Sequence, residues 1–368
     1  MVGGVYGKRA CFRRCGRGAR RVLGRLLAML VAACALLPAW CAAQTGEQAP
    51  PALRLGGYEL GRGLQLGDSG FTLGGYAKLM YEDESDRPPR LSLSHLSLFV
   101  WWEHDRFKFF SELDLEDAAA TRYDHEDEER RYLALERAYL DYAVDDSLTL
   151  RAGKFLTPVG RWNQIHADPL VWTSSRPLVT REVFPGSAVG VMALGTLLAR
   201  GQEVDYALYA SGDARMRASR EEQEFREAYG GRLNVRLPGG WQTGVSLGHF
   251  ERRSDDAAKY LGGLDFLWSH QGLELSGEAV WLQAVRGPAR VERGAFLQAA
   301  VPLAARLYGI VRVETLKRPG EQDATRMWVA GLNYRLAQGV ALKAEVVRGT
   351  HVPEEVEQGF LASVSVLF

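Results

Sequence analysis

Four basic residues, Lys154, Arg161, Arg176 and Arg181, lie in or beside one long segment, residues 156–187. Lysine and arginine bind carboxylate and phosphate groups through charge-assisted hydrogen bonds, so this grouping predicts contacts with anionic solutes. Unlike ordinary loops, the segment is rich in apolar and aromatic residues, and a connection of this length is uncommon unless it is functional. We expect it to pack on an inner wall and narrow a channel. The alternative is an outward loop that packs on itself or on a neighbouring subunit.

A second set of charges alternates with apolar residues along stretches of about ten residues. This polar set comprises Lys78, Lys108, Arg137, Arg151, Arg232, Arg236, Glu112, Asp114, Glu274 and Glu278. If these side chains line a water-filled lumen, its basic and acidic walls would orient dipolar solutes and tune ion selectivity. The alternative is that the charges only solvate the lumen.

Catalysis has little support in the sequence. His95 with Ser94 or Ser97 is the only pairing of histidine and serine within one stretch, and no GxSxG, P-loop or GxGxxG motif is present. We therefore expect no enzyme, no cofactor and no metal centre. The acidic run 124–129 suits hard cations, including ions that bridge lipopolysaccharide, although a solvated loop is the simpler explanation.

The elements that position these residues follow from the alternation, which has the period of a β-strand and not of a helix. In 71–81, for example, Leu73, Ala77 and Leu79 share one face, while Tyr76 and Lys78 share the other. Sixteen such strands are predicted, at 71–81, 91–102, 107–116, 133–144, 148–155, 188–197, 204–211, 229–237, 241–250, 260–268, 273–282, 295–301, 307–315, 327–336, 340–347 and 360–368.

The connections between these strands alternate between tight turns and longer, charged loops, as in bacterial outer-membrane barrels. No run of 18 apolar residues exists that would form a membrane helix. In hydrocarbon an unpaired backbone group costs several kcal/mol, so a spanning sheet must close on itself. The predicted fold is an all-β, antiparallel transmembrane barrel of about sixteen strands, residues 71–368, with the third outer loop folded inward.

Aromatic residues gather near strand ends on the apolar face, as interfacial girdles do. The alternative, a sandwich core, would place them in mid-strand. The last nine residues alternate and end at Phe368, which resembles the signal read by the barrel assembly machinery.

The first 43 residues predict a signal peptide, because eight basic residues and no acidic one precede a short apolar stretch and a small-residue site before Gln44. All four cysteines fall inside this segment. Its removal leaves a net charge of about −8, which argues against nucleic-acid binding. Residues 44–70 are expected to form a periplasmic leader or the approach to the first strand.

The segment from Leu150 to Gly160, with Arg176–Leu178, Arg181 and Phe184–Val191, resembles the phosphate-selective porin O and P family. In that family a strand ending in Gly-Lys/Gln-Phe-x-Thr-Pro-x-Gly leads into a constriction loop. The resemblance implies a sixteen-stranded homotrimer whose third loop carries Lys154, Arg161, Arg176 and Arg181. The dense basic ladder of the family is missing here, so the resemblance does not establish phosphate as the solute.

These observations predict a porin of the Gram-negative outer membrane that passes small hydrophilic solutes with a leaning toward anions. Its other expected partners are outer-membrane lipid and lipopolysaccharide. The alternative is a structural or adhesive barrel that is filled by its loops and conducts little.

Overall fold

The computed structural model describes residues 54–55, 58–84, 87–121, 131–165, 167–212, 216, 225–253, 257–285, 291–353, 356 and 358–368. The chain divides into the unit Met1–Gln48 and the unit Ala49–Phe368, and all described residues belong to the second. The predicted signal peptide and the acidic run 124–129 lie outside them. No described helix is long and apolar enough to cross a membrane.

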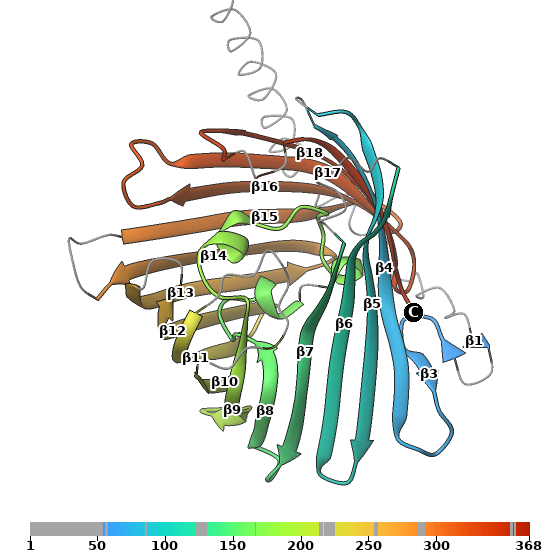
Figure 1. The fold of residues 1–368 in the computed structure, drawn as a ribbon, viewed down its shortest axis with the longest axis vertical. Coiled ribbons are helices and arrows are strands. Elements are labelled where there is room, and N and C mark those ends of the chain that lie inside the picture. The colour runs from blue at the N-terminus through green and yellow to red at the C-terminus, as the bar shows by residue number, and fades with distance from the viewer. Residues whose placement is uncertain are drawn as a thin grey trace, which may run out of the picture. The chain divides into compact units, whose positions relative to one another are not determined.

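Sixteen long antiparallel strands form one sheet that closes when the last pairs with the first, through contacts such as Ala362 with Tyr81 (Figure 1). The strands are β4 (Phe71–Glu84), β5 (Arg90–His104), β6 (Phe107–Ala120), β7 (Tyr132–Ala143), β8 (Thr149–Leu156), β9 (Ser187–Ala199), β10 (Gln202–Ser211), β11 (Phe225–Leu237), β12 (Trp241–Arg252), β13 (Ala257–His270), β14 (Leu273–Ala284), β15 (Val291–Ala304), β16 (Leu307–Lys317), β17 (Thr325–Ala337), β18 (Val340–Thr350) and β19 (Gly359–Leu367). The predicted closed barrel of sixteen strands is confirmed. Several strands run past their predicted ends at the long-loop side.

Three short strands precede the barrel: β1 (Arg54–Leu55), β2 (Tyr58–Glu59) and β3 (Gly63–Gln65). They pair in sequence, and β3 adds to the first residues of β4 through Leu64 with Leu73. The described part of 44–70 is therefore attached to the beginning of β4. Its periplasmic placement stays a prediction.

The two faces of the barrel wall differ in chemistry. On β15, Gln298 is 2% exposed, whereas its neighbour Leu297 is 44% exposed on the opposite face. Large apolar side chains are exposed in this way around the barrel, including Leu98, Leu140, Leu150, Val191, Leu208, Leu233, Leu247, Leu264, Leu297, Val313, Leu332 and Val364. An apolar exterior around a polar interior is the arrangement that a lipid bilayer stabilises.

Two-residue turns join many strands at the short-connection end. Arg200 and Gly201 between β9 and β10 both have positive φ (51° and 78°), as do Gln271 and Gly272 between β13 and β14 (49° and 80°). Positive φ at both central residues gives the type I′ turn, whose twist matches that of the paired strands.

Aromatic pairs lie at the same end of the barrel. Trp241 at the start of β12 contacts Trp268 near the end of β13, with ring centroids 5.9 Å apart, and Phe107 contacts Tyr142 in the same way at 5.1 Å. Trp241, Phe107 and Tyr142 are exposed on the outer face. This is the position of an interfacial girdle.

Leu297→Arg tests whether the outer face meets lipid. We expect the charged side chain to lower the free energy of unfolding by about 2–4 kcal/mol, the cost of an arginine near the middle of a bilayer. The measurement is guanidinium unfolding of the barrel refolded in phospholipid vesicles, with Leu297→Ala as the matched control. Equal midpoints for the two variants would mean that this face does not meet hydrocarbon.

Candidate functional site

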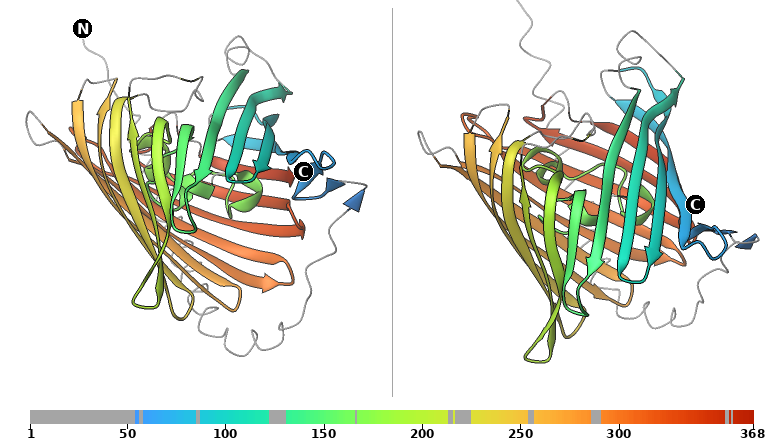
Figure 2. Two further views of the ribbon diagram at one scale, coloured as in Figure 1. Left: turned by 90° about the horizontal axis from the view of Figure 1, so that it is seen from below. Right: turned by 60° about the horizontal axis from the view of Figure 1, so that its bottom comes forward.

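The connection between β8 and β9 contains three short helices, η3 (Trp162–Ile165), η4 (Asp168–Leu170) and α3 (Leu178–Glu182). Figures 1 and 2 show these helices within the ring of strands. This segment is here called the inner loop (residues 157–186). Its backbone N–H groups bind inner-face residues of β14, β16 and β18, and its Asp168 side chain binds Lys78 of β4. In the strand order β16 lies across the ring from β8, so the inner loop crosses the interior.

The two ends of the inner loop are fastened to each other. Thr157 donates from its hydroxyl to the Pro185 carbonyl at 2.5 Å and from its backbone N–H to the Gly186 carbonyl at 3.0 Å. Asn163 donates from Nδ2 to the carbonyls of Thr157 and Gly186, at 2.9 and 2.8 Å. Thr157 and Asn163 are each 1% exposed, so these bonds are shielded from water. We call this bonded junction of the two loop ends the neck. The neck gives a physical reason for threonine in the motif that ends β8.

Gly160 brings the inner loop against Glu278 of β14. The carboxylate Oε1 accepts hydrogen bonds from the backbone N–H groups of Arg161 (2.7 Å) and Trp162 (2.5 Å). Gly160 has a φ of +65°, and a Cβ there would lie 2.2 Å from Oε2 of Glu278. Both the backbone conformation and the close approach require glycine.

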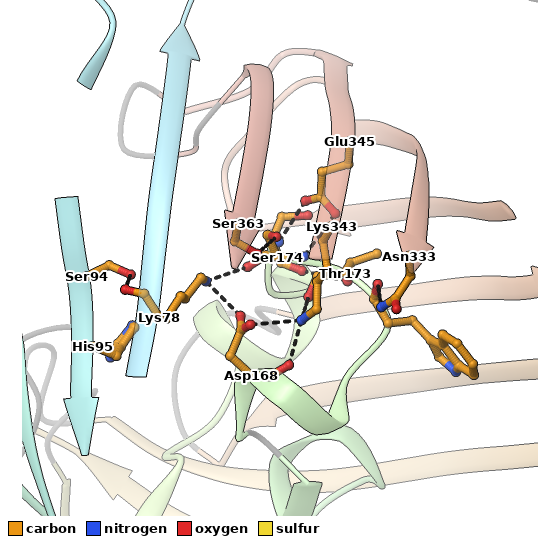
Figure 3. Close-up of polar contacts among 12 residues, drawn as sticks. Lys78, Ser94, His95, Asp168, Thr173, Ser174, Asn333, Lys343, Glu345 and Ser363 are labelled. Carbon is orange, nitrogen blue, oxygen red and sulfur yellow. Dashed lines mark hydrogen bonds and ion pairs between the residues drawn. The ribbon is translucent and has the colours of Figure 1, made fainter. Parts of the chain in front are cut away.

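Asp168 lies between two lysines from the far wall (Figure 3). Its carboxylate is 2.8 Å from Nζ of Lys78 on β4 and 2.9 Å from Nζ of Lys343 on β18. Burial alone would raise the pKa of Asp168, but the charges of Lys343 and Lys78 outweigh it and hold this pKa well below its ordinary value. Glu345, also on β18, accepts from the backbone N–H groups of Ser174 (2.9 Å) and Ser175 (2.7 Å).

Arg312 on β16 is fully buried and fixes the middle of the inner loop. It donates from Nε to Glu314 (2.7 Å), from Nη1 to the Thr173 hydroxyl (2.5 Å) and from Nη2 to the Ser175 hydroxyl (2.8 Å). The other oxygen of Glu314 accepts the backbone N–H of Leu178 at 2.6 Å. A buried guanidinium with this many partners is fully compensated.

Apolar contacts complete the attachment. Leu178, Val179, Val183 and Phe184 are each at most 2% exposed. They belong to one cluster with inner-face residues of the strands, among them Val280, Leu282, Phe296 and Leu316. Packing of the segment against a surface was expected from its apolar content. The inner wall supplies this surface.

The four cations predicted for the inner loop lie on different parts of the structure. Lys154, on β8, is buried and donates to the Leu135 carbonyl at 2.7 Å, while Arg176 donates to Asn163 and to the Thr180 carbonyl, both at 3.0 Å. Arg161 donates to Gln242 on β12 at 2.9 Å, and burial lowers the pKa of its guanidinium. Arg181 is half-buried within α3. Solute contact by these four residues stays a prediction.

The charges predicted to line the lumen form cross-strand pairs. Arg137 binds Glu112 at 2.5 Å, Arg151 binds Asp141 at 2.7 Å and Arg232 binds Asp265 at 2.5 Å. The remaining contacts are Arg236 with Glu203 and Asp205, Lys108 with Glu103, Asp114 with His95 and Ser97, Glu274 with Trp172, and those of Lys78 and Glu278 described above. The basic wall that the sequence suggested is therefore a wall of ion pairs.

His95, Ser94 and Ser97 do not form a hydrogen-bonded pair of serine and histidine. His95 Nδ1 lies 2.6 Å from one oxygen of Asp114, and Ser97 donates to the other at 2.7 Å. Ser94 donates to the Lys78 carbonyl at 3.3 Å (Figure 3). A nucleophilic serine must instead reach its base, so this geometry favours a structural role.

The anchors of the inner loop were not predicted from the sequence. Alternation places Lys343, Glu345, Arg312 and Glu314 on the lumen face but gives no partner for them, and Asp168 was missed. Alternation shows which face a residue occupies, whereas the partner depends on how the loop crosses the ring. The available signal for Asp168 was its charge, because Asp168 and Glu182 are the two acidic residues of the segment 156–187.

Gly160→Ala tests the contact with Glu278. We expect the free energy of unfolding to fall by about 2–4 kcal/mol, because strain at positive φ and overpacking of a closed contact add together. Gly201→Ala is the matched control, since Gly201 has a similar φ but a Cβ there meets nothing within 4 Å. Guanidinium unfolding of both variants gives the difference. A loss at Gly160 no larger than at Gly201 would show that the close contact is absent.

The Asp168 anchor predicts a contribution to the stability of the inner loop that does not depend on pH in the neutral and weakly acidic range. Because the pKa of Asp168 is lowered in the folded state, this stabilisation is present above the ordinary pKa of aspartate and is lost as pH falls through the lowered value. We expect the excess current noise of Asp168→Asn over the unsubstituted protein, recorded in a planar bilayer, to be the same from neutral pH down to about pH 4, near the ordinary value for aspartate. Asp168→Asn removes the carboxylate that the two buried lysines share and should cost about 3–5 kcal/mol and increase the noise. The exposed Asp105→Asn is the control; equal noise in both variants would exclude the anchor.

Comparison with known sequences does not show a family for this chain. No model of a known protein family matches the chain. An uncharacterized protein of Aquifex aeolicus (strain VF5) is 27% identical over 225 residues, which cover 56% of this chain and 50% of that protein. The chain therefore spans about half the length of this curated relative.

Solved structures show the same architecture. An anion-selective porin from Comamonas acidovorans is 13% identical, with 81% of this chain and 98% of that chain covered and a TM-score of 0.57. OmpF of Salmonella typhi in complex with daunomycin is 11% identical (86% and 99% covered, TM-score 0.58), and the outer membrane channel DcaP of Acinetobacter baumannii is 10% identical (83% and 100%, TM-score 0.52). At these identities the likeness establishes the fold, and the narrower resemblance to the phosphate-selective porins stays a prediction. The closed barrel and these neighbours support the predicted location in the Gram-negative outer membrane.

Proposed function

We propose that the protein is an outer-membrane porin through which small hydrophilic solutes diffuse passively, with the inner loop as its constriction. Sixteen strands enclose an aqueous channel and not a core filled by side chains. The inner loop reduces this channel, and its anchors keep the reduction constant. The porin barrels among the structural neighbours support a channel.

One observation carries this proposal: the inner loop is anchored to the lumen wall, and a hollow remains between the loop and another part of the wall. Its anchors lie on β14, β16, β18 and β4. On the side of β7 to β11 a half-open cavity of about 430 Å³ is lined by Arg137, Arg151 and Arg232 of the wall and by Pro158 and Gln164 of the inner loop. A hollow bounded by both the wall and the loop is the natural route past a constriction.

The same cavity favours anions, although its charges are paired. In the pair of Arg137 with Glu112 the arginine side chain is 18% exposed and the glutamate 0%, and Arg232 is 11% exposed against 3% for Asp265. Arg151 and Asp141 follow the same order, at 18% and 13%. In each pair the arginine side chain is therefore the more exposed member. Oriented pairs of this kind attract anions at short range.

The assembly that we propose is a homotrimer in contact with lipid and lipopolysaccharide. OmpT of Vibrio cholerae, which has the same fold at 9% identity, was solved in a trimer form, and this supports the proposal. The carboxyl-terminal Phe368 exchanges two backbone hydrogen bonds with Gly75, each 2.8 Å long, so the proposed signal for the assembly machinery lies next to the closing pair of strands.

Single-channel recording in a planar bilayer under a KCl gradient tests the function. We expect stable steps and a reversal potential on the anion side. Arg151→Gln should reduce the ratio of anion to cation permeability about twofold, the effect of one charge at roughly 8 Å in a watery channel.

Arg106→Gln is the matched control, because Arg106 lies in an exposed turn and binds the Val144 carbonyl. An unchanged ratio in Arg151→Gln would remove the anion preference and leave the porin. Absence of any steps from a folded barrel would instead favour the loop-filled structural barrel.

A further inference from the structure

A continuous row of aromatic side chains crosses four neighbouring strands on the inner wall. It consists of Tyr76 (β4), Phe99 and Trp101 (β5), Phe110 (β6) and Tyr139 (β7). Successive ring centroids are 5.8 Å apart for Tyr76 and Phe99, 5.7 Å for Phe99 and Phe110, and 5.6 Å for Phe110 and Tyr139. Trp101 contacts both phenylalanines, at 5.2 and 5.4 Å. We call these five residues the aromatic row.

The aromatic row faces the lumen and not the lipid. Phe99 and Phe110 are 4% and 7% exposed. On the opposite face of the wall, Leu98 of β5 and Leu140 of β7 are 46% and 42% exposed. Ala167 of the inner loop belongs to the same buried apolar cluster as Tyr76, Phe99 and Phe110. Aromatic rings on a lumen wall are not needed for contact with hydrocarbon, so this row requires another reason.

Two arginines cap the other end of the row. The Cζ atom of Arg137 lies 4.6 Å from the centroid of Phe110, and that of Arg151 lies 3.7 Å from the centroid of Tyr139. Both arginines use Nε and Nη2 for their carboxylate partners. Among the described residues, no hydrogen bond engages Nη1 of either one. Each therefore retains donor capacity beside an aromatic ring.

Tyr139 lines two half-open cavities. A half-open cavity of about 590 Å³ is lined by Trp101, Phe110, Tyr139 and Lys108, together with residues at the short-turn end. The cavity of about 430 Å³ along the arginines is also lined by Tyr139. Both volumes suit a small molecule. Tyr139 joins an aromatic hollow to a cationic one.

We propose that this junction is a binding site for organic anions with a planar apolar part, of which aromatic carboxylates are the simplest. The carboxylate binds the guanidinium groups of Arg137 and Arg151, and the ring packs on Trp101, Phe110 and Tyr139. Guanidinium groups match carboxylates in geometry, and rings prefer offset or edge contacts with other rings. This inference rests on the proposed porin function and narrows its solute class.

Benzoate, cyclohexanecarboxylate and acetate, added to open wild-type channels in KCl, test the site. Transient reduction of the current by benzoate should be half-maximal at a concentration about three- to tenfold lower than for cyclohexanecarboxylate, because ring-to-ring contact adds to burial. Acetate should be weaker still. Equal potency of all three anions, with normal conductance steps, would overturn the aromatic site and leave the porin function intact. Absence of steps would overturn both.

Substitutions then locate the site. Tyr139→Leu should abolish the preference for benzoate over cyclohexanecarboxylate, while Tyr142→Leu should keep it, because Tyr142 is exposed on the outer face of the same strand. KCl conductance and heat-modified mobility show that each variant is folded. Phe110→Leu is the second variant. If either Tyr139→Leu or Phe110→Leu folds and still prefers benzoate, the proposal is overturned.

Discussion

Closure of the sheet between β19 and β4 is the constraint on which the rest of the structure depends. In hydrocarbon no water is available to pair backbone N–H and C=O groups, so an open edge would be prohibitively costly. The backbone bonds between Phe368 and Gly75 extend the closing pair to the end of the chain. Once the ring closes, alternation along every strand fixes the chemistry of both faces. The outer face can then be apolar, as at Leu297, and the inner face must accommodate all the polar side chains.

An interior of this kind requires partners for its buried charges, and the inner loop supplies many of them. Glu278, Glu314 and Glu345 come from alternate strands, β14, β16 and β18, and each accepts backbone N–H groups of the inner loop. A hydrogen bond to a charged acceptor contributes about 1.5–3 kcal/mol, whereas a buried carboxylate without partners is strongly destabilising. Lys78 and Lys343 are buried cations that require an anionic partner, and Asp168 of the inner loop is that partner. The loop and the wall therefore stabilise each other, and this accounts for a loop held across the ring.

Much of this architecture could be predicted from the sequence, because the period of two and the alternation of short and long connections are local properties. All sixteen predicted strands are present, and the long segment before Ser187 was recognised as unusual. Ion pairs such as Arg137 with Glu112 could not be predicted, since a shift of one residue in the register of neighbouring strands changes every partner. The aromatic row was missed for a different reason. Only aromatic residues of the outer face were interpreted from the sequence. Tyr76 shares its face with Lys78, and Phe99 shares its face with Ser97, so alternation already placed both rings toward the lumen.

Net charge does not decide which ions such a channel prefers. The chain beyond the predicted signal peptide carries a net charge of about −8, but charges on outer loops are screened within roughly 8–10 Å, whereas a charge on the constriction wall acts on the ion directly. The pairs at Arg137, Arg151 and Arg232 are neutral as pairs, and in each one the arginine side chain is the more exposed member. In the proposed channel, a passing anion meets the more exposed arginine of each pair first, and the attraction is greatest at contact distance. On this proposal the order of exposure within each pair, and not the sum of charges, sets the field along the route past the inner loop.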